Sequence, residues 1–124
     1  KEPHLLERAY DDAQGVTAAF NLNMLHHLNR RLGRPVFDPS GFEHRSFWNE
    51  DNSRIEMHLV STRNQKIDLH NTRYIFEKDD YIVTEYSHKY TNKSLRQLLA
   101  GLFEITQVWK DADGLFGLYC VTPV

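Results

Sequence analysis

The first change in the spacing of apolar residues along this chain is from a helical period to a strand period. Between residues 16 and 32, apolar side chains recur at intervals of three and four, which is typical of a helix with one buried face. These positions are Phe20, Met24, Leu25, Leu28 and Leu32, and Gly33 and Pro35 then end the pattern. After the turn sequence at 38–41 the pattern repeats every second residue, which is typical of strands. One long helix followed by strands predicts an α+β fold.

Several strands are expected after this change of period. They cover residues 42–48, 54–61, Lys66 to Leu69 or, with an extension across a bulge at His70-Asn71, to Phe76, and Tyr81 to Tyr90. Short polar stretches separate the strands and reverse the chain. We therefore predict an antiparallel meander sheet packed with an N-terminal helix at 16–32, and a further short helix at 5–12.

The C-terminal part is predicted to contain one helix and a strand pair. Asn92-Lys93-Ser94 is a favourable helix start, and the helix is expected to run to about Ala100. Strands are expected at 103–109 and 115–121, on either side of a tight turn at 111–114.

Composition excludes several classes of protein. The chain has 124 residues, 40% hydrophobic and 26% charged, which is typical of a compact globular protein. Its net charge is −2 and its basic residues are scattered, so no nucleic-acid partner is expected. No apolar stretch approaches the roughly 20 residues that span a bilayer, so we expect no membrane partner and a cytoplasmic location. The single cysteine, Cys120, lies in an apolar run and is expected to be buried.

A carboxylate and a hydroxyl occur two residues apart in the strand expected at 81–90. Glu85 and Ser87 would project from the same side of that strand. A carboxylate can accept from one N–H of an imidazole while a hydroxyl pairs with the other nitrogen. The spacing is also typical of two polar residues on the solvated face of a sheet. Spacing alone leaves both interpretations open.

A second polar cluster, residues 10–23, lies where the long helix begins. Free N–H groups at a helix start can bind an anion such as an amino-acid carboxylate. Asp12 or Thr17 could instead cap the helix with its own side chain. The residues do not decide between these interpretations.

The residues supply no catalytic machinery of their own. None of the seven histidines occurs in a His-Glu-x-x-His arrangement, and His26 and His27 point to different sides of a helix, so no metal site is expected. The sequence has no Gly-x-Ser-x-Gly elbow for a nucleophile. It also has no Gly-x-Gly or Walker-type loop that could hold a nucleotide or an adenosyl group.

Seven segments, taken in order, carry a resemblance to a known family. They are Tyr10-Asp11-Asp12, Gly15-Val16-Thr17-Ala18-Ala19-Phe20-Asn21-Leu22-Asn23, Leu28-Asn29-Arg30-Arg31-Leu32-Gly33, Phe42-Glu43-His44, Arg54-Ile55-Glu56-Met57-His58-Leu59, Thr84-Glu85-Tyr86-Ser87-His88-Lys89-Tyr90 and Trp109-Lys110-Asp111. Together they resemble the histidine-specific Nα-methyltransferases of ergothioneine biosynthesis. The resemblance extends over nearly the whole chain but corresponds only to the C-terminal portion of such an enzyme.

The resemblance implies an organisation in two parts. In that family a class I methyltransferase core binds S-adenosylmethionine, and a second domain recognises histidine. Residues 1–90 would belong to the recognition domain, and residues 91–124 would be the last helix and strand pair of the core. S-adenosylmethionine is then the cofactor of the full-length protein, none is expected on this chain alone, and this chain alone is expected to be inactive.

The resemblance also assigns roles to four residues. Glu85 and Ser87 match the pair that grips the substrate imidazole, Met57 matches a residue that lines the pocket, and Tyr10 matches a tyrosine that helps to bind the amino-acid end. The expected partners are histidine and its methylated forms. The sequence departs from the family pattern near Gly101, where the end of the helix is shorter.

Two other functions fit the same residues. The chain could be a non-enzymatic module that binds a small ligand or forms a dimer, or it could serve a methyltransferase for another amino acid. If the rest of a methyltransferase core is missing, apolar side chains of the C-terminal part would lack packing partners and favour self-association. The residues concerned are Leu95, Leu98, Leu115 and Leu118.

Overall fold

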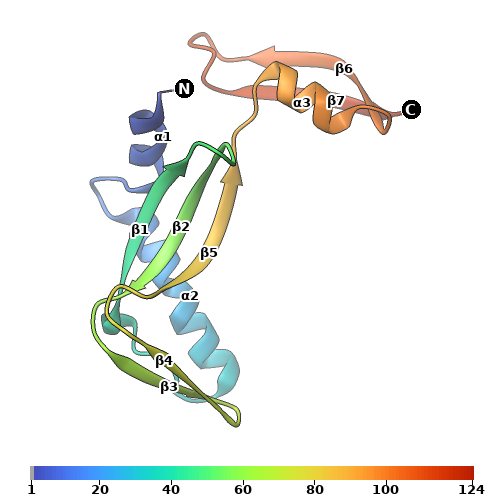
Figure 1. The fold of residues 1–124 in the computed structure, drawn as a ribbon. Helices are drawn as coiled ribbons and strands as arrows, with labels where there is room; N and C mark the ends of the chain where they lie inside the picture. Colours follow the sequence, from blue (N-terminus) through green and yellow to red (C-terminus); the bar gives the residue numbers. More distant parts are fainter. Residues whose placement is uncertain (1) are drawn as a thin grey trace. The chain divides into compact units, whose positions relative to one another are not determined.

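The computed structural model describes residues 2–124 and confirms an α+β fold with antiparallel sheets (Figure 1). The chain divides into two compact units, residues 2–88 and residues 89–124. The functional roles that the sequence assigns to these two parts stay predictions.

The 2–88 unit begins with two helices. The long helix α2 (Val16–Leu32) has the expected bounds, and Gly33 ends it in the left-handed conformation with φ of 67°. The first helix, α1 (Pro3–Tyr10), starts and ends two residues earlier than the expected 5–12. Proline favours this earlier start, because its fixed φ suits the first helical turn and its missing N–H is not needed there.

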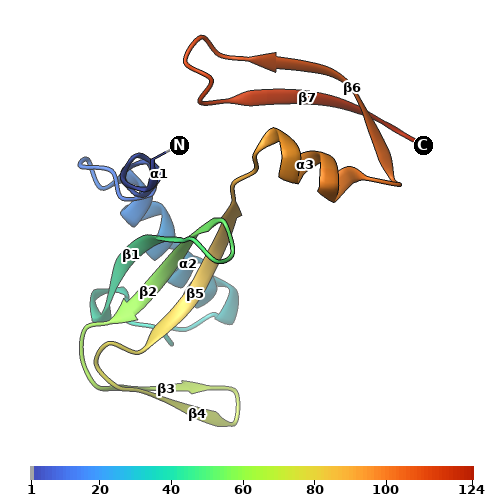
Figure 2. The same cartoon turned by 45° about the horizontal axis from the view of Figure 1, so that its top comes forward.

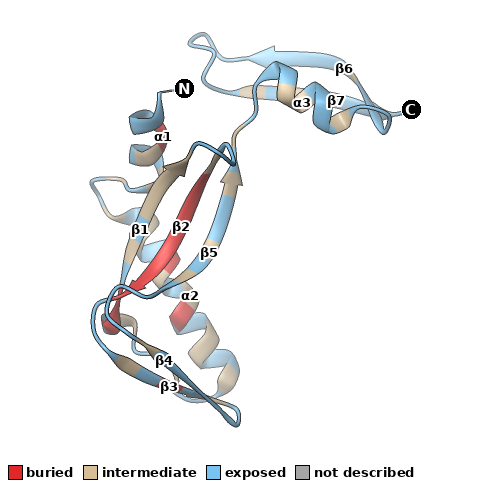
Figure 3. Ribbon diagram, viewed as in Figure 1, coloured by how far each residue is buried: buried red, intermediate tan, exposed pale blue. Residues whose placement is uncertain are grey.

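A three-stranded sheet forms the centre of this unit. Its strands are β1 (Phe42–Asn49), β2 (Arg54–Ser61) and β5 (Tyr81–His88), in the order β1-β2-β5 and antiparallel throughout. Every residue of β2 from Ile55 to Ser61 is buried, since β2 has a strand on each side (Figure 3). The strands β1 and β2 agree with the predicted segments to within one residue.

The segment between β2 and β5 differs from the prediction. It folds back on itself as a separate hairpin of β3 (Gln65–Leu69) and β4 (Thr72–Phe76). The predicted extension of one strand across a bulge at His70-Asn71 is therefore wrong, because these two residues form a tight turn with His70 at φ of 54°. A bulge and a two-residue turn leave similar alternation on both sides, so the sequence pattern did not separate them.

Two apolar clusters hold the helices against one face of the sheet. The first contains Leu25 of α2 with Phe42, Leu59 and Ile67. The second contains Leu6 of α1 with Ile55 and Met57, and Tyr10 and Trp48 pack against it. Both clusters contain alternate residues of β2, so α1 and α2 cover the same face of the sheet.

A β-bulge interrupts the pairing of β2 with β5. Met57 pairs with Glu85 and His58 pairs with Val83, which leaves Thr84 as an extra residue in β5. Two carbonyl groups beside the bulge accept hydrogen bonds from side chains. The Thr84 hydroxyl donates to the Met57 carbonyl at 2.9 Å, and the Asn21 amide donates to the His58 carbonyl at 3.1 Å.

The 89–124 unit consists of α3 (Asn92–Leu99) and a hairpin of β6 (Phe103–Lys110) and β7 (Gly117–Pro123) (Figure 2). Thr91 caps the helix in a capping box with Ser94. None of residues 89–124 is buried. The prediction of a buried Cys120 is therefore wrong, because no second layer covers the hairpin within this unit.

Candidate functional site

The four residues assigned from the sequence meet on one face of the β1-β2-β5 sheet. Met57 and Glu85 are cross-strand partners, and Ser87 is the partner of Ile55. The Tyr10 side chain, from the last residue of α1, packs against the cluster that contains Met57. Its hydroxyl lies 2.7 Å from the Ser87 hydroxyl, and either group can be the donor.

The bulge at Thr84 determines which face carries Glu85 and Ser87. Ile82 packs into the core against α2, and without an extra residue Glu85, three positions later, would point to the opposite face. Because of the bulge, Glu85 and Ser87 share the face that the helices cover. Tyr86 points the other way, where the Arg54 guanidinium lies 3.5 Å from the centre of its ring.

The Glu85 carboxylate is available for a ligand. Glu85 is exposed, and its side chain makes no hydrogen bond or ion pair with any of residues 2–124. The Tyr10 and Ser87 hydroxyls beside it are half-buried. Each hydroxyl can donate one hydrogen bond and accept two. An acceptor of full negative charge therefore lies next to groups that can both donate and accept.

Met57 lies in the buried apolar cluster beneath these polar groups. Its side chain is 2% exposed and packs with Leu6 and Ile55. Its other strand partner is Ser46 of β1, whose hydroxyl oxygen is buried and has no hydrogen-bond partner within residues 2–124. The row Ser46, Met57 and Glu85 thus crosses all three strands on the same face.

At the start of α2, the Asp12 side chain bonds to the free N–H groups that could otherwise bind an anionic ligand. Its carboxylate accepts hydrogen bonds from the N–H groups of Thr17 at 2.8 Å and Val16 at 3.0 Å. These bonds, the Thr17 N–H first, lower the pKa of Asp12 to about 2. The side chain therefore caps the helix, and these two N–H groups already have an anionic partner.

His44 and Asn21 also belong to the surroundings of the site. Asn21 lies in the polar cluster at 10–23, but sequence reasoning assigned neither residue a contact with Tyr10. The His44 ring contacts the Tyr10 carbonyl through Nε2 at 2.8 Å and the Asn21 amide through Nδ1 at 2.9 Å. Both residues lie in segments that carry the family resemblance. A histidine at an inward-facing strand position was the one signal that could have identified His44.

The opposite face of the sheet carries a buried charged network. Glu56 is 6% exposed and accepts hydrogen bonds from Asn49 at 2.9 Å, from Arg54 at 2.9 Å and from His58 at 3.1 Å. Burial raises the pKa of the Glu56 carboxyl, but these hydrogen bonds, from Arg54 above all, outweigh burial and hold the pKa below its usual value. Arg54 of this network also packs on the Tyr86 ring. The network therefore contacts the residue between Glu85 and Ser87 on the opposite face of the sheet.

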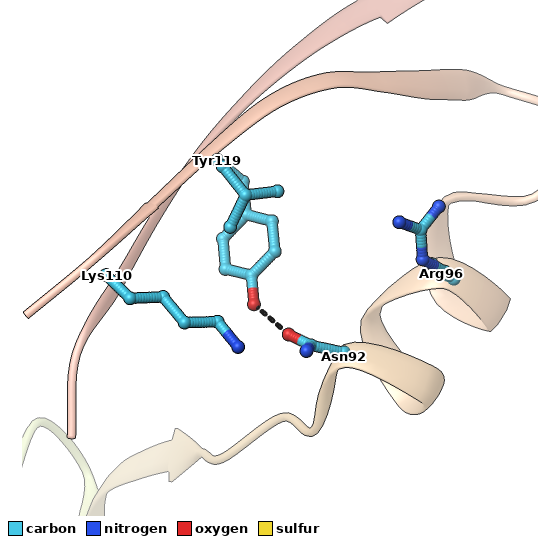
Figure 4. Close-up of a pocket in the computed structure, with 5 residues that line it drawn as sticks. Asn92, Arg96, Lys110 and Tyr119 are labelled. Atoms are coloured by element: carbon cyan, nitrogen blue, oxygen red, sulfur yellow. Dashed lines mark hydrogen bonds between the residues drawn. The ribbon is translucent and has the colours of Figure 1, made fainter. Parts of the chain in front are cut away.

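A separate cavity of about 380 Å³ lies in the 89–124 unit, between α3 and the β6–β7 hairpin (Figure 4). It is lined by Asn92, Arg96, Val108, Lys110 and Tyr119. The Tyr119 hydroxyl donates a hydrogen bond to the Asn92 side chain. Two of the five lining residues are cationic and none is acidic.

Residues 1–123 match the family of histidine-specific, S-adenosylmethionine-dependent methyltransferases, and the chain belongs to this family. It is 41% identical over 122 residues to the histidine N-alpha-methyltransferase of Mycolicibacterium smegmatis and 38% identical over 122 residues to that of Mycobacterium tuberculosis. It is 24% identical over 119 residues to ergothioneine biosynthesis protein 1 of Schizosaccharomyces pombe.

The matches cover most of this chain but a smaller share of each relative. They include 95% of the chain in all three comparisons. The chain spans 37% of the length of each bacterial relative and 15% of the length of the yeast one.

Residues 2–124 do not contain the arrangement of elements that commonly holds the cofactor of the family. An adenosyl group is commonly held by a glycine-rich loop between a parallel strand and a helix, with an acidic side chain on the ribose. All three sheets within residues 2–124 are antiparallel. The cavity beside α3 offers two cations and no carboxylate, which disfavours a sulfonium ligand.

Two further findings on the described residues concern metal ions and membrane-spanning helices. Among residues 2–124, no three side chains of the metal-binding types are grouped as ligands of one ion. No helix in that range is long and apolar enough to cross a membrane.

Proposed function

We propose that this chain supplies the substrate-recognising part of an S-adenosylmethionine-dependent enzyme that methylates the α-amino group of histidine. Family membership and the names of the two bacterial relatives support this proposal. The observation that carries it is the exposed Glu85 carboxylate next to the hydrogen-bonded Tyr10 and Ser87 hydroxyls, above the buried Met57 side chain.

This set of groups suits an imidazole ring. A neutral imidazole has one N–H donor and one acceptor nitrogen. Glu85 accepts from the N–H in a charge-assisted hydrogen bond, and Ser87 pairs with the other nitrogen. Met57, the buried cross-strand partner of Glu85, belongs to the apolar cluster beneath the ring. Other amino-acid side chains of similar size do not offer a donor and an acceptor on opposite sides of a flat ring.

The proposed role of the chain in the reaction is placement. Methyl transfer to an amine needs the nitrogen to lie roughly 3 to 3.5 Å from the methyl carbon in a fixed direction. A histidine held by its ring at Glu85 and Ser87 presents its α-amine in one position through successive methylations, up to trimethylhistidine. S-adenosylmethionine supplies the methyl group, and we place its binding in parts of the protein other than residues 2–124.

Tyr10 is assigned to the amino-acid end of the substrate, whereas in the structure its hydroxyl bonds to Ser87. The two arrangements are compatible if the Tyr10 hydroxyl gives up its hydrogen bond to Ser87 when the substrate binds and forms one to the substrate instead. Replacing one hydrogen bond by another changes the free energy only slightly.

The division into two units supports separate roles for the two parts. We propose that residues 1–90 are the recognition domain and that residues 91–124 complete the methyltransferase core. The 89–124 unit has no buried residue, although α3 and its hairpin carry many large apolar side chains. Within residues 91–124, those more than half exposed are Leu98, Leu102, Phe116, Leu118 and Val124. An apolar surface of this kind packs against other polypeptide, or against a second copy when the chain is alone.

Calorimetry on the protein at its full natural length tests the proposal. Histidine and Nα,Nα-dimethylhistidine are titrated into the wild type and the Glu85→Ala variant, with S-adenosylhomocysteine present. Because the lost bond involves a charged acceptor, we expect binding to weaken by about 1.5 to 3 kcal/mol, or roughly 10- to 150-fold.

The control is Glu50→Ala, which removes an exposed carboxylate from the turn between β1 and β2 and should leave the affinity unchanged. Equal affinities for wild type and Glu85→Ala would remove Glu85 from the site. If neither ligand bound the wild type but another amino acid did, the chain would serve a methyltransferase for that amino acid. If no amino acid bound, the chain would be a non-enzymatic module.

A further inference from the structure

We infer that His44 is a positioning residue for the histidine site and that it acts by fixing Tyr10. The inference rests on the proposed function, because it concerns how that site is held in shape. His44 belongs to β1, so it reaches Tyr10 from the far edge of the sheet relative to Glu85 and Ser87.

The hydrogen bonds of the His44 ring define its state. The Tyr10 carbonyl at 2.8 Å only accepts, so Nε2 must carry a proton. The Asn21 Nδ2 group at 2.9 Å only donates, so Nδ1 must be unprotonated. His44 is therefore a neutral imidazole in the Nε2–H tautomer. Its position is fixed from both sides of the ring.

The two contacts of the His44 ring involve different parts of the site, the end of α1 and the surroundings of the bulge. Tyr10 is the last residue of α1, so its carbonyl has no partner within the helix, and His44 satisfies it. Asn21 is 3% exposed, and the nitrogen that faces His44 also donates to the His58 carbonyl beside the bulge. That carbonyl fixes the orientation of the Asn21 amide, because the amide oxygen could not take the place of the nitrogen there.

A continuous set of hydrogen bonds thus joins the two halves of the site. It runs from the His58 carbonyl through Asn21 and His44 to the Tyr10 backbone, and the Tyr10 side chain then reaches Ser87. The same imidazole therefore links the helix end that carries Tyr10, directly, with the bulge that turns Glu85 toward the helices, through Asn21.

Two substitutions separate the two contacts of the ring. The amide nitrogen of glutamine lies near the position of Nε2, so His44→Gln retains a donor for the Tyr10 carbonyl. The amide oxygen of asparagine lies near the position of Nδ1, so His44→Asn retains an acceptor for Asn21 but loses the bond to Tyr10. If His44 acts through Tyr10, His44→Asn should weaken histidine binding more than His44→Gln does. A role of His44 in general stability alone does not predict this order.

The experiment measures histidine affinity by calorimetry, with the protein at its full natural length and S-adenosylhomocysteine present. We expect His44→Asn to weaken binding roughly fivefold, the effect of one lost hydrogen bond, and His44→Gln to stay within about threefold of wild type. In a Tyr10→Phe background, His44→Asn should cause no further loss, because the two residues act on one contact. Equal effects of the two His44 variants, or full additivity with Tyr10→Phe, would overturn the inference.

A measurement without substitution keeps the test independent of variant folding. Nitrogen-15 NMR of the His44 ring should show Nε2 protonated and Nδ1 unprotonated, and the reverse tautomer would contradict the inference. Failure of the proposed function gives a different result: the wild type then binds no histidine at all. If the wild type binds histidine in a Glu85-dependent manner and His44→Asn binds equally well, only the role of His44 is lost.

Discussion

Asp12 shows how one side chain fixes the start of a helix. Its two carboxylate oxygens bond to consecutive N–H groups of the first turn of α2, and the ionised form is strongly favoured there. The pKa of Asp12 falls from 3.8 to about 2 in the folded chain. A carboxyl with a depressed pKa stabilises the fold at pH values above its unfolded pKa, and this stabilisation is lost as the pH falls through the folded pKa.

This argument predicts how the stability of the chain depends on pH. Between pH 3.8 and about 2, wild type should lose stability that the Asp12→Asn variant never had. Urea unfolding at several pH values, compared between the two proteins, isolates the contribution of Asp12 from that of other carboxyls. Asp12→Ser, which keeps an uncharged capping oxygen, should resemble Asp12→Asn in this window. A constant difference between wild type and Asp12→Asn over the whole window would contradict the assignment.

Some contacts of single residues could be predicted from the sequence and others could not. Glu85 and Ser87 could be paired from the two-residue period of a strand, and the structure places their side chains on one face as expected. Neither His44 nor Asn21 could be connected to Tyr10 in this way, because their contacts join three segments that are distant in sequence. Periodicity describes the faces of one element and says nothing of which elements meet.

At the scale of elements, the bulge in β5 links the core to the site. The extra residue lets Ile82 face α2 and Glu85 face the same side of the sheet. In a regular strand these two positions would point to opposite faces. The alternation in the sequence could not reveal this shift, because Thr84 is a normal strand residue and its hydroxyl satisfies the Met57 carbonyl only in the folded sheet.

Deletion of Thr84 should therefore separate the site from the core. Without the extra residue, either Ile82 or Glu85 and Ser87 must turn to the other face, and we expect histidine affinity to fall at least as far as in Glu85→Ala. Thr84→Val keeps the chain length and loses only the hydrogen bond to Met57, at a cost in stability of roughly 1 kcal/mol. Calorimetry and thermal unfolding of both variants provide the comparison. A deletion variant that folded and bound histidine like wild type would show that the bulge does not set the site.

The long elements were the most predictable part of the fold. The bounds of α2 and β2 agree with the predicted 16–32 and 54–61, since each segment has an unbroken period and clear turn residues at its ends. The β3–β4 hairpin and the exposure of Cys120 were not predicted. The hairpin was missed because a two-residue turn and a bulge leave the same alternation, and Cys120 was misjudged because the apolar residues around it do not show whether another layer covers the strand.

At the scale of the whole molecule, the two units differ in their packing. The 2–88 unit contains all of the buried residues within 2–124, and β2 is covered on both sides by other strands. The 89–124 unit relies on the pairing of one hairpin and the capping of α3. Few buried apolar contacts and many exposed backbone hydrogen bonds are the properties of segments that open easily.

Hydrogen exchange of the 124-residue chain should reveal this difference. Amide protons of β2 are expected to exchange at least about 100-fold more slowly than those of β6 and β7. Mass spectrometry of peptides from each strand measures both rates in one sample, and the peptide that covers β5 serves as an internal reference. Equal protection of β2 and β7 would mean that the hairpin has packing partners in solution, as self-association of the chain would provide.

The single extra residue in β5 also affects how such chains are aligned with one another. Between Ile82 and Glu85, the number of residues matters as much as their identity, because a gap or insertion of one position moves the side chains that follow from the helix-covered face of the sheet to the opposite face. Two relatives that align well by residue type on either side of Thr84 could still present different groups to a substrate. When the substrate specificities of relatives are compared, the number of residues in this strand should therefore be compared along with the residue types.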